Sequence, residues 1–512
     1  MRYSAISTGA RLGPAVVAWA VALAAEMHAS EFMAGADISS LVVHENNGAI
    51  YKDYGQTQPG DLIEILSSHG VNWYRLRLFV DPQMQNNWNG GFDAFVVQDL
   101  EYTIALAQRV KAAGGKVLLD FHYSDTWADP GHQWKPDAWR SIPTLQGLAD
   151  QVYSYTKETI EAFNAAGVPP EMVQIGNEIA SGLLWNGEYV TPVNNSTVGG
   201  DNTGYPWTGG SNSAGFDRLA TLLSAGIRGA RDGAPGQEPE IMIHHDQGSN
   251  WGATSYYFDR LIPRLQADGA DFDIIGYSYY PIYHSGGITA VQTNLTNTVA
   301  AYGKPVAIVE AGFPFRNPTP QEQNLGFPVT EAGQQAYLQA LVDALQGLTR
   351  DMGRGVFWWY AEARPTTGLN VWQNGRYGLF DQTGNLNDAV MVFEEFLPPP
   401  GDFNRDGYVD AGDYVRWRNS LGDANEANIS WAGDGDGVSE SDYELWRENY
   451  GTPPAGAGGL ARRPGPPTVP EPASLVLFLF GVACLGSLRR TGSEKSLPQM
   501  MQVAADENAA NR

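Results

Sequence analysis

Between residues 31 and 398, short runs rich in apolar and β-branched residues alternate with longer stretches whose apolar residues recur every three or four positions. The short runs predict β-strands, and the longer stretches predict amphipathic helices such as Val97–Ala113, Leu145–Ala166 and Glu331–Leu348. Eight strands are expected at Phe32–Ile38, Trp73–Phe79, Lys116–Phe121, Met172–Ile175, Ile241–His245, Phe272–Tyr277, Pro305–Val309 and Gly355–Trp359.

Two α/β architectures fit this alternation, a doubly wound parallel sheet and a closed (β/α)8 barrel. Polar and aromatic residues cluster repeatedly just after the predicted strands, where barrel enzymes build their active sites. We therefore predict a (β/α)8 TIM barrel over residues 31–398 as the catalytic domain. Since such a barrel takes roughly 250 residues or more, a chain of 512 residues has room for further modules.

Residues 1–30 have the pattern of a secretory signal peptide. Arg2 and Arg11 accompany the apolar run Leu12–Ala25, and small residues suited to cleavage follow. The run is short for a membrane span, and a retained N-terminal anchor is the alternative. The protein is therefore expected to be secreted or associated with the cell envelope.

After residue 400 the composition changes to Gly and Asp, and two similar stretches begin at Gly401 and Gly433. This repeat, residues 400–452, resembles a dockerin type I module, a small α-helical domain with calcium loops of the EF-hand kind. The resemblance implies a cohesin-like or cell-surface partner. It also implies Ca²⁺ ligands at loop positions 1, 3, 5, 9 and 12, namely Asp402, Asn404, Asp406, Asp410 and Asp413.

The second loop of the repeat contains Asp434, Asp436 and Asp442 and is one residue shorter than the first. It is either a weaker calcium site or an acidic turn. A Pro/Gly linker is expected at 453–468. The apolar segment 469–490 resembles a PEP-CTERM sorting signal and is either a membrane anchor or a removable signal, and residues 491–512 form a polar tail.

The balance of charges narrows the choice of partner. The 57 acidic residues outnumber the 32 basic ones, for a net charge of −25, which argues against nucleic acid or an anionic membrane surface as the main partner. A neutral polymer suits this chain better. The 15 Trp and 24 Tyr supply flat rings for sugar stacking or for barrel packing, and the single cysteine, Cys484, excludes an internal disulfide.

Two glutamates that follow predicted strands are the candidate catalytic residues. Glu178 comes after Met172–Ile175, and Glu310 ends an apolar run 132 residues later. Burial would raise the pKa of Glu178, as a general acid requires. In a barrel both can face the axis, and a separation of about 5–5.5 Å would give a configuration-retaining double displacement with Glu310 as nucleophile and Glu178 as acid/base.

Arg75 and Arg77 are two positions apart in a predicted strand and therefore point to the same face. One of them is expected to pair with Glu310 and lower its pKa, and the sequence does not decide which. We expect both arginines to contact sugar, together with other polar and aromatic residues that follow the strands: His122, Asp125, Trp127, Asn177, His244, Asp246, Tyr279, Tyr280 and Trp359. Zinc catalysis by the histidines is the alternative, but no HExxH motif supports it.

At these residues the chain resembles glycoside hydrolase family 53, the arabinogalactan endo-β-1,4-galactanases. The resemblance spans roughly residues 32–396 and implies a (β/α)8 retaining enzyme without a cofactor for catalysis, acting on galactan or arabinogalactan. It implies Glu178 as proton donor, Glu310 as nucleophile, and sugar contacts at Asp37 and Trp185. The motifs that carry it are GADISS (35–40), YRLR (74–77), HYSDTWADP (122–130), GNEI (176–179), GLLW (182–185), SYYP (278–281) and VE (309–310).

The chain departs from the family pattern after the last predicted strand. There WYAE (359–362) replaces the usual Trp-Glu-Pro, which puts the shape of the sugar subsites in question. Two rival functions follow. One is a barrel hydrolase acting on another β-glycan, such as mannan or xylan, and the other is a non-catalytic glycan-binding protein.

Overall fold

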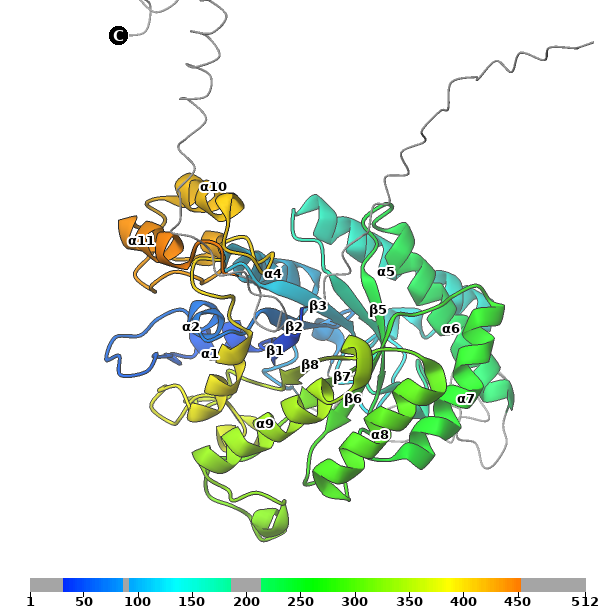
Figure 1. The fold of residues 1–512 in the computed structure, drawn as a ribbon. Helices are drawn as coiled ribbons and strands as arrows, with labels where there is room; N and C mark the ends of the chain where they lie inside the picture. The colour runs from blue at the N-terminus through cyan, green and yellow to red at the C-terminus, as the bar shows by residue number, and fades with distance from the viewer. Residues whose placement is uncertain (1–30, 86–91, 186–212, 453–512) are drawn as a thin grey trace, which may run out of the picture.

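The computed structural model describes residues 31–85, 92–185 and 213–452 (Figure 1). The segments predicted as signal peptide, linker, sorting segment and polar tail lie outside the described residues. Within the described part of the chain, no helix is long and apolar enough to cross a membrane.

Eight parallel strands close into one barrel in sequence order, with β1 hydrogen-bonded to both β2 and β8. This confirms the predicted TIM barrel and excludes the doubly wound sheet. The strands are β1 (Met33–Asp37), β2 (Trp73–Leu78), β3 (Lys116–Phe121), β4 (Met172–Ile175), β5 (Glu240–His245), β6 (Ile274–Tyr279), β7 (Val306–Ala311) and β8 (Gly353–Trp358).

The strand ends differ from prediction mainly at β6 and β7, each of which ends two residues later than expected. The pairing of these two strands shifts register between Tyr277 and Ser278, so that Ser278 lies opposite Glu310. Such an irregularity re-aims side chains at a barrel rim. Tyr279 and Glu310 consequently lie within strands, whereas the sequence pattern placed them just beyond.

Helices surround the barrel, as Figure 1 shows. Several begin where an Asp, Asn or Thr side chain accepts a hydrogen bond from a free backbone N–H of the first turn, for example Asp99 before α4 and Thr330 before α9. The helices are α1 (Leu41–Asn46), α2 (Leu62–Ser68), α4 (Leu100–Ala112), α5 (Leu145–Ala165), α6 (Ser213–Asp232), α7 (Trp251–Ala267), α8 (Gly287–Tyr302) and α9 (Glu331–Gln346).

Apolar side chains fill the interior of the barrel toward the start of its strands. This interior cluster is separate from the larger core between the sheet and the helices. Its members are Met33, Trp73, Leu118, Met172, Met242, Ile274, Ala307, Val309 and Phe357. Because this end is packed with apolar groups, the polar side chains of the interior are left at the opposite, C-terminal end of the strands, where barrel enzymes work.

Residues 401–452 form a small unit with its own apolar core. Two helices, α10 (Ala411–Ser420) and α11 (Glu440–Asn449), bury Trp417 and Trp446 against each other's loops. The unit, orange in Figure 1, lies beside α2 and α4. Trp431 Nε1 donates to the carbonyl of Ala113 at 3.0 Å, directly before β3, so the unit is attached to the end of the barrel opposite the polar rim.

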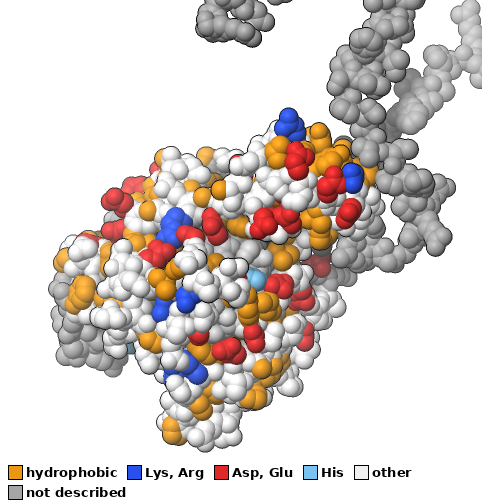
Figure 2. Space-filling model, turned by 90° about the vertical axis from the view of Figure 1, so that its left-hand side faces the viewer, with side chains coloured by type: hydrophobic (Ala, Val, Ile, Leu, Met, Phe, Trp, Pro, Cys, Tyr) orange, Lys and Arg blue, Asp and Glu red, His pale blue; other side chains and the backbone are white. Residues whose placement is uncertain are grey.

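The face of the molecule in Figure 2 carries acidic side chains scattered among uncharged ones, with only a few basic side chains between them. This agrees with the net charge of −25.

Candidate active site

A cleft of about 540 Å³ opens at the C-terminal ends of the strands, and a second hollow of about 340 Å³ adjoins it. Glu178, Glu310, Trp359 and Trp372 line both, so the two carboxyl groups lie where the hollows meet. The cleft is therefore the place where chemistry on a bound molecule is possible.

Glu178 stands in a strained backbone position. It follows β4 and has φ of +48° and ψ of +49°, a left-handed conformation that costs energy for a residue other than glycine. Its Oε1 lies 2.6 Å from the hydroxyl of Ser278, which donates to the ionised carboxyl group. The side chain of Gln133 donates to the carbonyl of the preceding Asn177 at 2.7 Å and helps to hold this turn.

Glu310 lies in β7 and is only 6% exposed. Its Oε1 is 2.9 Å from Nη1 of Arg75, and its Oε2 accepts a hydrogen bond from the hydroxyl of Tyr280 at 3.1 Å. The carboxyl group is thus held by a cation on one oxygen and a neutral donor on the other.

The two carboxyl groups differ in their electrostatics. Burial, and next the nearby Glu310, raise the pKa of Glu178 well above its usual value. Burial also raises the pKa of Glu310, to about 7, although Arg75 acts in the opposite direction. An arginine therefore pairs with Glu310 and lowers its pKa as expected, but burial outweighs the ion pair. Within the described residues, Glu310 has a cationic hydrogen-bonding partner and Glu178 has none.

The structure decides between the two arginines of β2. Arg75 is buried and forms ion pairs with Asp37 at 3.0 Å and Asp120 at 2.8 Å as well as with Glu310. Arg77 instead lies over the ring of Trp127, 4.1 Å from its centroid. Arg75 is thus the partner of Glu310. Asp120 was missed from the sequence because it lies inside the apolar run of β3; the single acid in LLDF was its only signal.

Eight of the predicted sugar-contacting residues line the cleft or the adjoining hollow, and five do not. Those that do are Arg75, Arg77, His122, Trp127, Asn177, Asp246, Tyr280 and Trp359.

The five remaining residues are buried and support their neighbours instead. Asp37 contacts Arg75, and Asp125 accepts hydrogen bonds from the backbone of Asp81 and Asp137. The other three are as follows: Tyr279 stacks on Tyr337, Trp185 packs edge-on against Trp134, and His244 lies between Asn177 and Ser278. These five residues contact groups behind the walls of the two hollows, and their contact with sugar stays a prediction.

Sequence reasoning also missed part of the cleft wall. Asp93 and Phe95 come from the loop after β2, and residues 370–373 come from the loop after β8. Asp93 accepts a hydrogen bond from the indole of Trp127 at 2.9 Å. The only signal for the last loop was a further tryptophan, Trp372, following Trp358 and Trp359.

A family model, "Glycosyl hydrolase family 53", matches residues 33–393, which is well over half of the chain. The chain belongs to glycosyl hydrolase family 53. This makes it a glycosidase, in agreement with a cleft that holds two carboxyl groups.

Individual relatives agree with this assignment. The family 53 chain is 40% identical over 342 residues to a probable arabinogalactan endo-β-1,4-galactanase A of Aspergillus terreus, covering 65% of this chain and 87% of the relative. It is 36% identical over 367 residues to arabinogalactan endo-β-1,4-galactanase A of Aspergillus niger, covering 70% and 94%.

Solved structures show the same barrel. A structure described as one of two fungal β-1,4-galactanases superposes with a TM-score of 0.57 at 31% identity, covering 71% of this chain and 99% of that one. The GH53 catalytic domain of Ignisphaera aggregans gives a TM-score of 0.59 at 29% identity, covering 71% and 95%. The family match ends at residue 393, so residues 401–452 lie beyond it.

Tyr280→Phe tests the electrostatics of this family 53 site. The Tyr280 hydroxyl donates to Glu310 and thereby lowers the pKa of that carboxyl group. Its loss should raise the pKa of Glu310. If activity requires ionised Glu310, the acidic limb of kcat/KM, expected near pH 7, moves to higher pH. An acidic limb that stays in place or moves to lower pH would contradict the contact.

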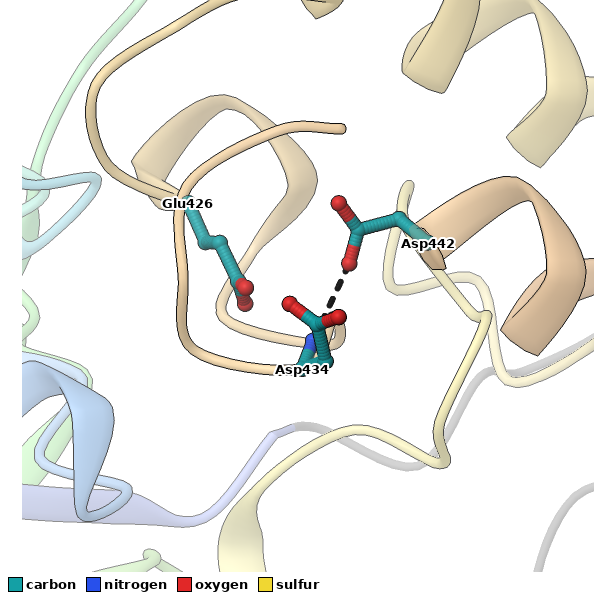
Figure 3. A group of neighbouring side chains, drawn as sticks. All are labelled: Glu426, Asp434 and Asp442. Carbon is teal, nitrogen blue, oxygen red and sulfur yellow. Dashed lines mark hydrogen bonds between the residues drawn. The ribbon is translucent and has the colours of Figure 1, made fainter. Parts of the chain in front are cut away.

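The described part of the family 53 chain contains one group of three carboxylates close enough to share a metal ion, and it lies in the small unit rather than in the cleft. Glu426, Asp434 and Asp442 place oxygens within 4.8 Å of one another (Figure 3). Glu426, which comes from upstream of the predicted loop, was missed by sequence reasoning.

The five predicted calcium ligands share one loop before and at the start of α10. Asp402 accepts from the backbone N–H of Gly407 at 3.0 Å through Oδ2, while its buried Oδ1 has no partner in the described structure. Asp413 accepts from the backbone of Asn404 at 2.9 Å and from that of Asp410 at 2.8 Å. Asn404 also donates to Asp406 at 2.9 Å. The donor set of this loop, all oxygen, suits Ca²⁺.

Proposed function

We propose that this family 53 glycosidase hydrolyses internal β-1,4-galactosidic bonds of galactan or arabinogalactan with retention of anomeric configuration. The observation that carries the proposal is the pair of carboxyl groups, Glu178 and Glu310, which line one cleft and have different partners. The names of the relatives support the choice of galactan.

In the first step, an oxygen of Glu310 attacks the anomeric carbon while Glu178 gives its proton to the leaving glycosidic oxygen. The Arg75 and Tyr280 contacts stabilise the ionised form of Glu310, which is the form that attacks. Burial and the charge of Glu310 favour the protonated form of Glu178, because both raise its pKa. In the second step, ionised Glu178 takes a proton from water, and the resulting hydroxide displaces Glu310 from the sugar.

The lining of the cleft suits a neutral sugar chain. Trp127, Trp359 and Trp372 offer flat faces for galactose rings, and Arg77 stacked on Trp127 fixes one of them. Asn177 and Asp246 add groups that hydrogen-bond hydroxyls. No group in this proposed mechanism requires a metal or an organic cofactor.

Release of reducing ends from linear β-1,4-galactan, mannan and xylan tests the substrate. We expect galactan to be cleaved fastest, with Glu178→Ala as the control that leaves no measurable hydrolysis of the polymer. Faster release from mannan or xylan would overturn the choice of galactan. Binding of galactan by the wild-type protein without any product, at several pH values, would overturn the proposed activity.

We also propose that residues 400–452 form a dockerin-like calcium module that attaches the enzyme to a cohesin-like or cell-surface partner. The buried and unpartnered Oδ1 of Asp402 supports a cation in the first loop. In the second loop, Glu426 accepts from the backbone of Gly435 much as Asp402 accepts from that of Gly407. The shorter second loop has no aspartate at the position that corresponds to Asp402, and Glu426 therefore supplies the carboxylate there.

Calorimetric titration of the full chain with Ca²⁺ tests this module. We expect binding that Asp402→Ala weakens at least tenfold, because the variant removes one charged ligand of about six. Removal of Ca²⁺ with a chelator should lower the unfolding temperature. Binding of two ions, reduced to one by Glu426→Gln, would assign a site to the second loop as well. No heat of Ca²⁺ binding would contradict the module.

The proposed place of action is outside the cytoplasm. Residues 1–30 would serve as signal peptide and residues 469–490 as a PEP-CTERM-like sorting or anchoring segment. The linker 453–468 would separate that segment from the calcium module. This arrangement suits an enzyme whose polymeric substrate does not enter the cell.

A further inference from the structure

A chain of buried hydrogen-bonding groups runs from Glu178 into the barrel. Oε1 of Glu178 lies 2.6 Å from the hydroxyl of Ser278, and that hydroxyl lies 2.9 Å from Nε2 of His244. Ser278 and His244 are fully buried, and neither lines the cleft. They therefore reach the substrate only through Glu178.

The other ring nitrogen of His244 faces two partners of opposite kind. Oδ1 of Asn177, an acceptor, lies 2.9 Å from Nδ1, and the backbone N–H of Glu178, a donor, lies 3.2 Å from it. Nδ1 can satisfy only one of them at a time, since it either carries a hydrogen or presents a lone pair.

The orientation of the Asn177 amide is determined by its other contacts. Its Oδ1 accepts from Nη2 of Arg75 at 2.7 Å, and its Nδ2 donates to the carbonyl of Ala128 at 2.7 Å. The oxygen rather than the nitrogen therefore faces His244. A doubly protonated ring is disfavoured, because burial and the neighbouring Arg75 lower the pKa of His244 well below its usual value.

Each neutral tautomer of His244 matches one state of Glu178. With hydrogen on Nδ1, the ring donates to Asn177, and its Nε2 accepts from Ser278. The Ser278 oxygen then accepts from protonated Glu178. With hydrogen on Nε2, the ring donates to Ser278, whose hydroxyl donates to ionised Glu178, and Nδ1 accepts from the Glu178 backbone.

We propose that Ser278 and His244 are positioning residues whose hydrogen bonds reverse direction when Glu178 changes its protonation state. The proposal rests on the proposed role of Glu178 as acid/base. The change removes the hydrogen from Nδ1 and adds one at Nε2 by exchange with water that enters the site, so the charge of the ring stays the same. The only net loss is the proton that Glu178 gives to the leaving group, and the water of the second step restores it.

This row of hydrogen bonds solves a problem that arises because Glu178 acts first as an acid and then as a base. A carboxyl oxygen that faces a fixed donor has a hydrogen bond when ionised and loses it when protonated. Reversal gives Oε1 of Glu178 a hydrogen bond to Ser278 in both states. Glu178 therefore keeps one position through both steps, in spite of its strained backbone.

Several charged or titratable groups from neighbouring strands surround this chain and contribute to its pH dependence. They are Arg75 on β2, Asp120 on β3 with His122 after it, Asp129, His245 on β5 with Asp246 after it, Tyr280 after β6 and Glu310 on β7. A test must therefore distinguish the titration of Glu178 from the titration of these groups, above all from that of Glu310.

Nitrogen-15 NMR of the full chain with labelled histidine measures the tautomer directly, and His244→Gln assigns the signals. As the pH rises through the pKa of Glu178, the two His244 nitrogens should exchange their protonated and unprotonated shifts. His245 is an internal control: its Nδ1 accepts from the backbone of Gln247 at 3.1 Å, which keeps its hydrogen on Nε2 throughout.

Two variants identify the group that drives the exchange. In Glu178→Ala the exchange should disappear. In Glu310→Gln it should persist but occur at lower pH, because the Glu310 charge that raises the pKa of Glu178 is gone. A single His244 tautomer at all pH values, in wild-type protein that cleaves galactan, would overturn the proposal and leave the proposed function intact. An inactive wild type would instead overturn the function.

Ser278→Ala separates positioning from a loss of structure. For a galactobioside with a poor leaving group, kcat/KM should fall about tenfold or more, because that step needs the acid. For a dinitrophenyl leaving group, which departs without a proton, kcat/KM should change less than about twofold. An equal fall with both substrates would mean structural damage and would contradict the positioning role.

Discussion

Glu310→Ala is expected to abolish hydrolysis of galactan, with a fall in kcat of about 10⁵-fold or more, because no other group can form the covalent bond to the sugar. Glu310 is fixed between Arg75 and Tyr280, so the gap left by the variant is the size of one carboxylate. The assay is release of reducing ends, with thermal unfolding of the variant as the control for folding.

Azide should restore turnover of Glu310→Ala on an aryl galactobioside with a good leaving group. The small anion enters the vacated space and attacks the anomeric carbon from the same side as Glu310 would. The product should be the α-glycosyl azide, of inverted configuration, identified by its proton NMR coupling. Activity of Glu310→Ala near that of wild type, or a β-glycosyl azide as product, would contradict the role of Glu310.

Arg75→Met is expected to have the largest effect on stability. Arg75 is fully buried and neutralises Asp37, Asp120 and Glu310. Its loss leaves buried carboxylates without a cation, which costs roughly 3–5 kcal/mol in the free energy of unfolding. The pKa of Glu310 should also rise, because its ion pair is lost. Activity should then fall at neutral pH and recover in part at higher pH.

Arg77→Met is the matched control for Arg75→Met. Arg77 lies two residues along the same strand and is equally buried, yet it forms no ion pair within the described residues and contacts Ser40 and Trp127 instead. Its loss should weaken galactan binding with less loss of stability. Equal losses in the free energy of unfolding for the two variants, measured by chemical denaturation, would contradict the role of Arg75 as the cation that pairs with three carboxylates.

The barrel was predictable because its signal is repeated eight times along the chain. The strands at Lys116–Phe121 and Met172–Ile175 were predicted with their ends correct. The ends of β6 and β7 were not, because their register shift depends on pairing between segments that the local pattern does not describe.

The acid/base and nucleophile candidates were visible because each carboxyl group lies at or shortly after the end of a predicted strand. The supporting residues were harder to place. Tyr279 and Tyr280 are adjacent, yet Tyr280 reaches Glu310 while Tyr279 packs outward on Tyr337, because neighbouring residues at a strand end point to opposite faces. Asp120 and Glu426 contact their sites from positions in the sequence that belong to no recognisable motif.

The net rise in the pKa of Glu310 could not be predicted from the sequence, for a related reason. The sequence showed that an arginine lies nearby, but it did not show that Glu310 itself is almost fully buried. Desolvation of a carboxylate depends on the whole surrounding fold and can exceed the effect of one ion pair.

The central claim is that Glu310 forms a covalent bond to galactose, and trapping of that intermediate tests it most directly. A 2-deoxy-2-fluoro galactoside with a good leaving group should inactivate the enzyme, since the fluorine slows release of the sugar more than activated loss of the leaving group. Mass spectrometry of a proteolytic digest should then find one added sugar on the peptide that contains Glu310. A sugar attached to another residue, or active enzyme that releases α-configured product directly, would contradict the account.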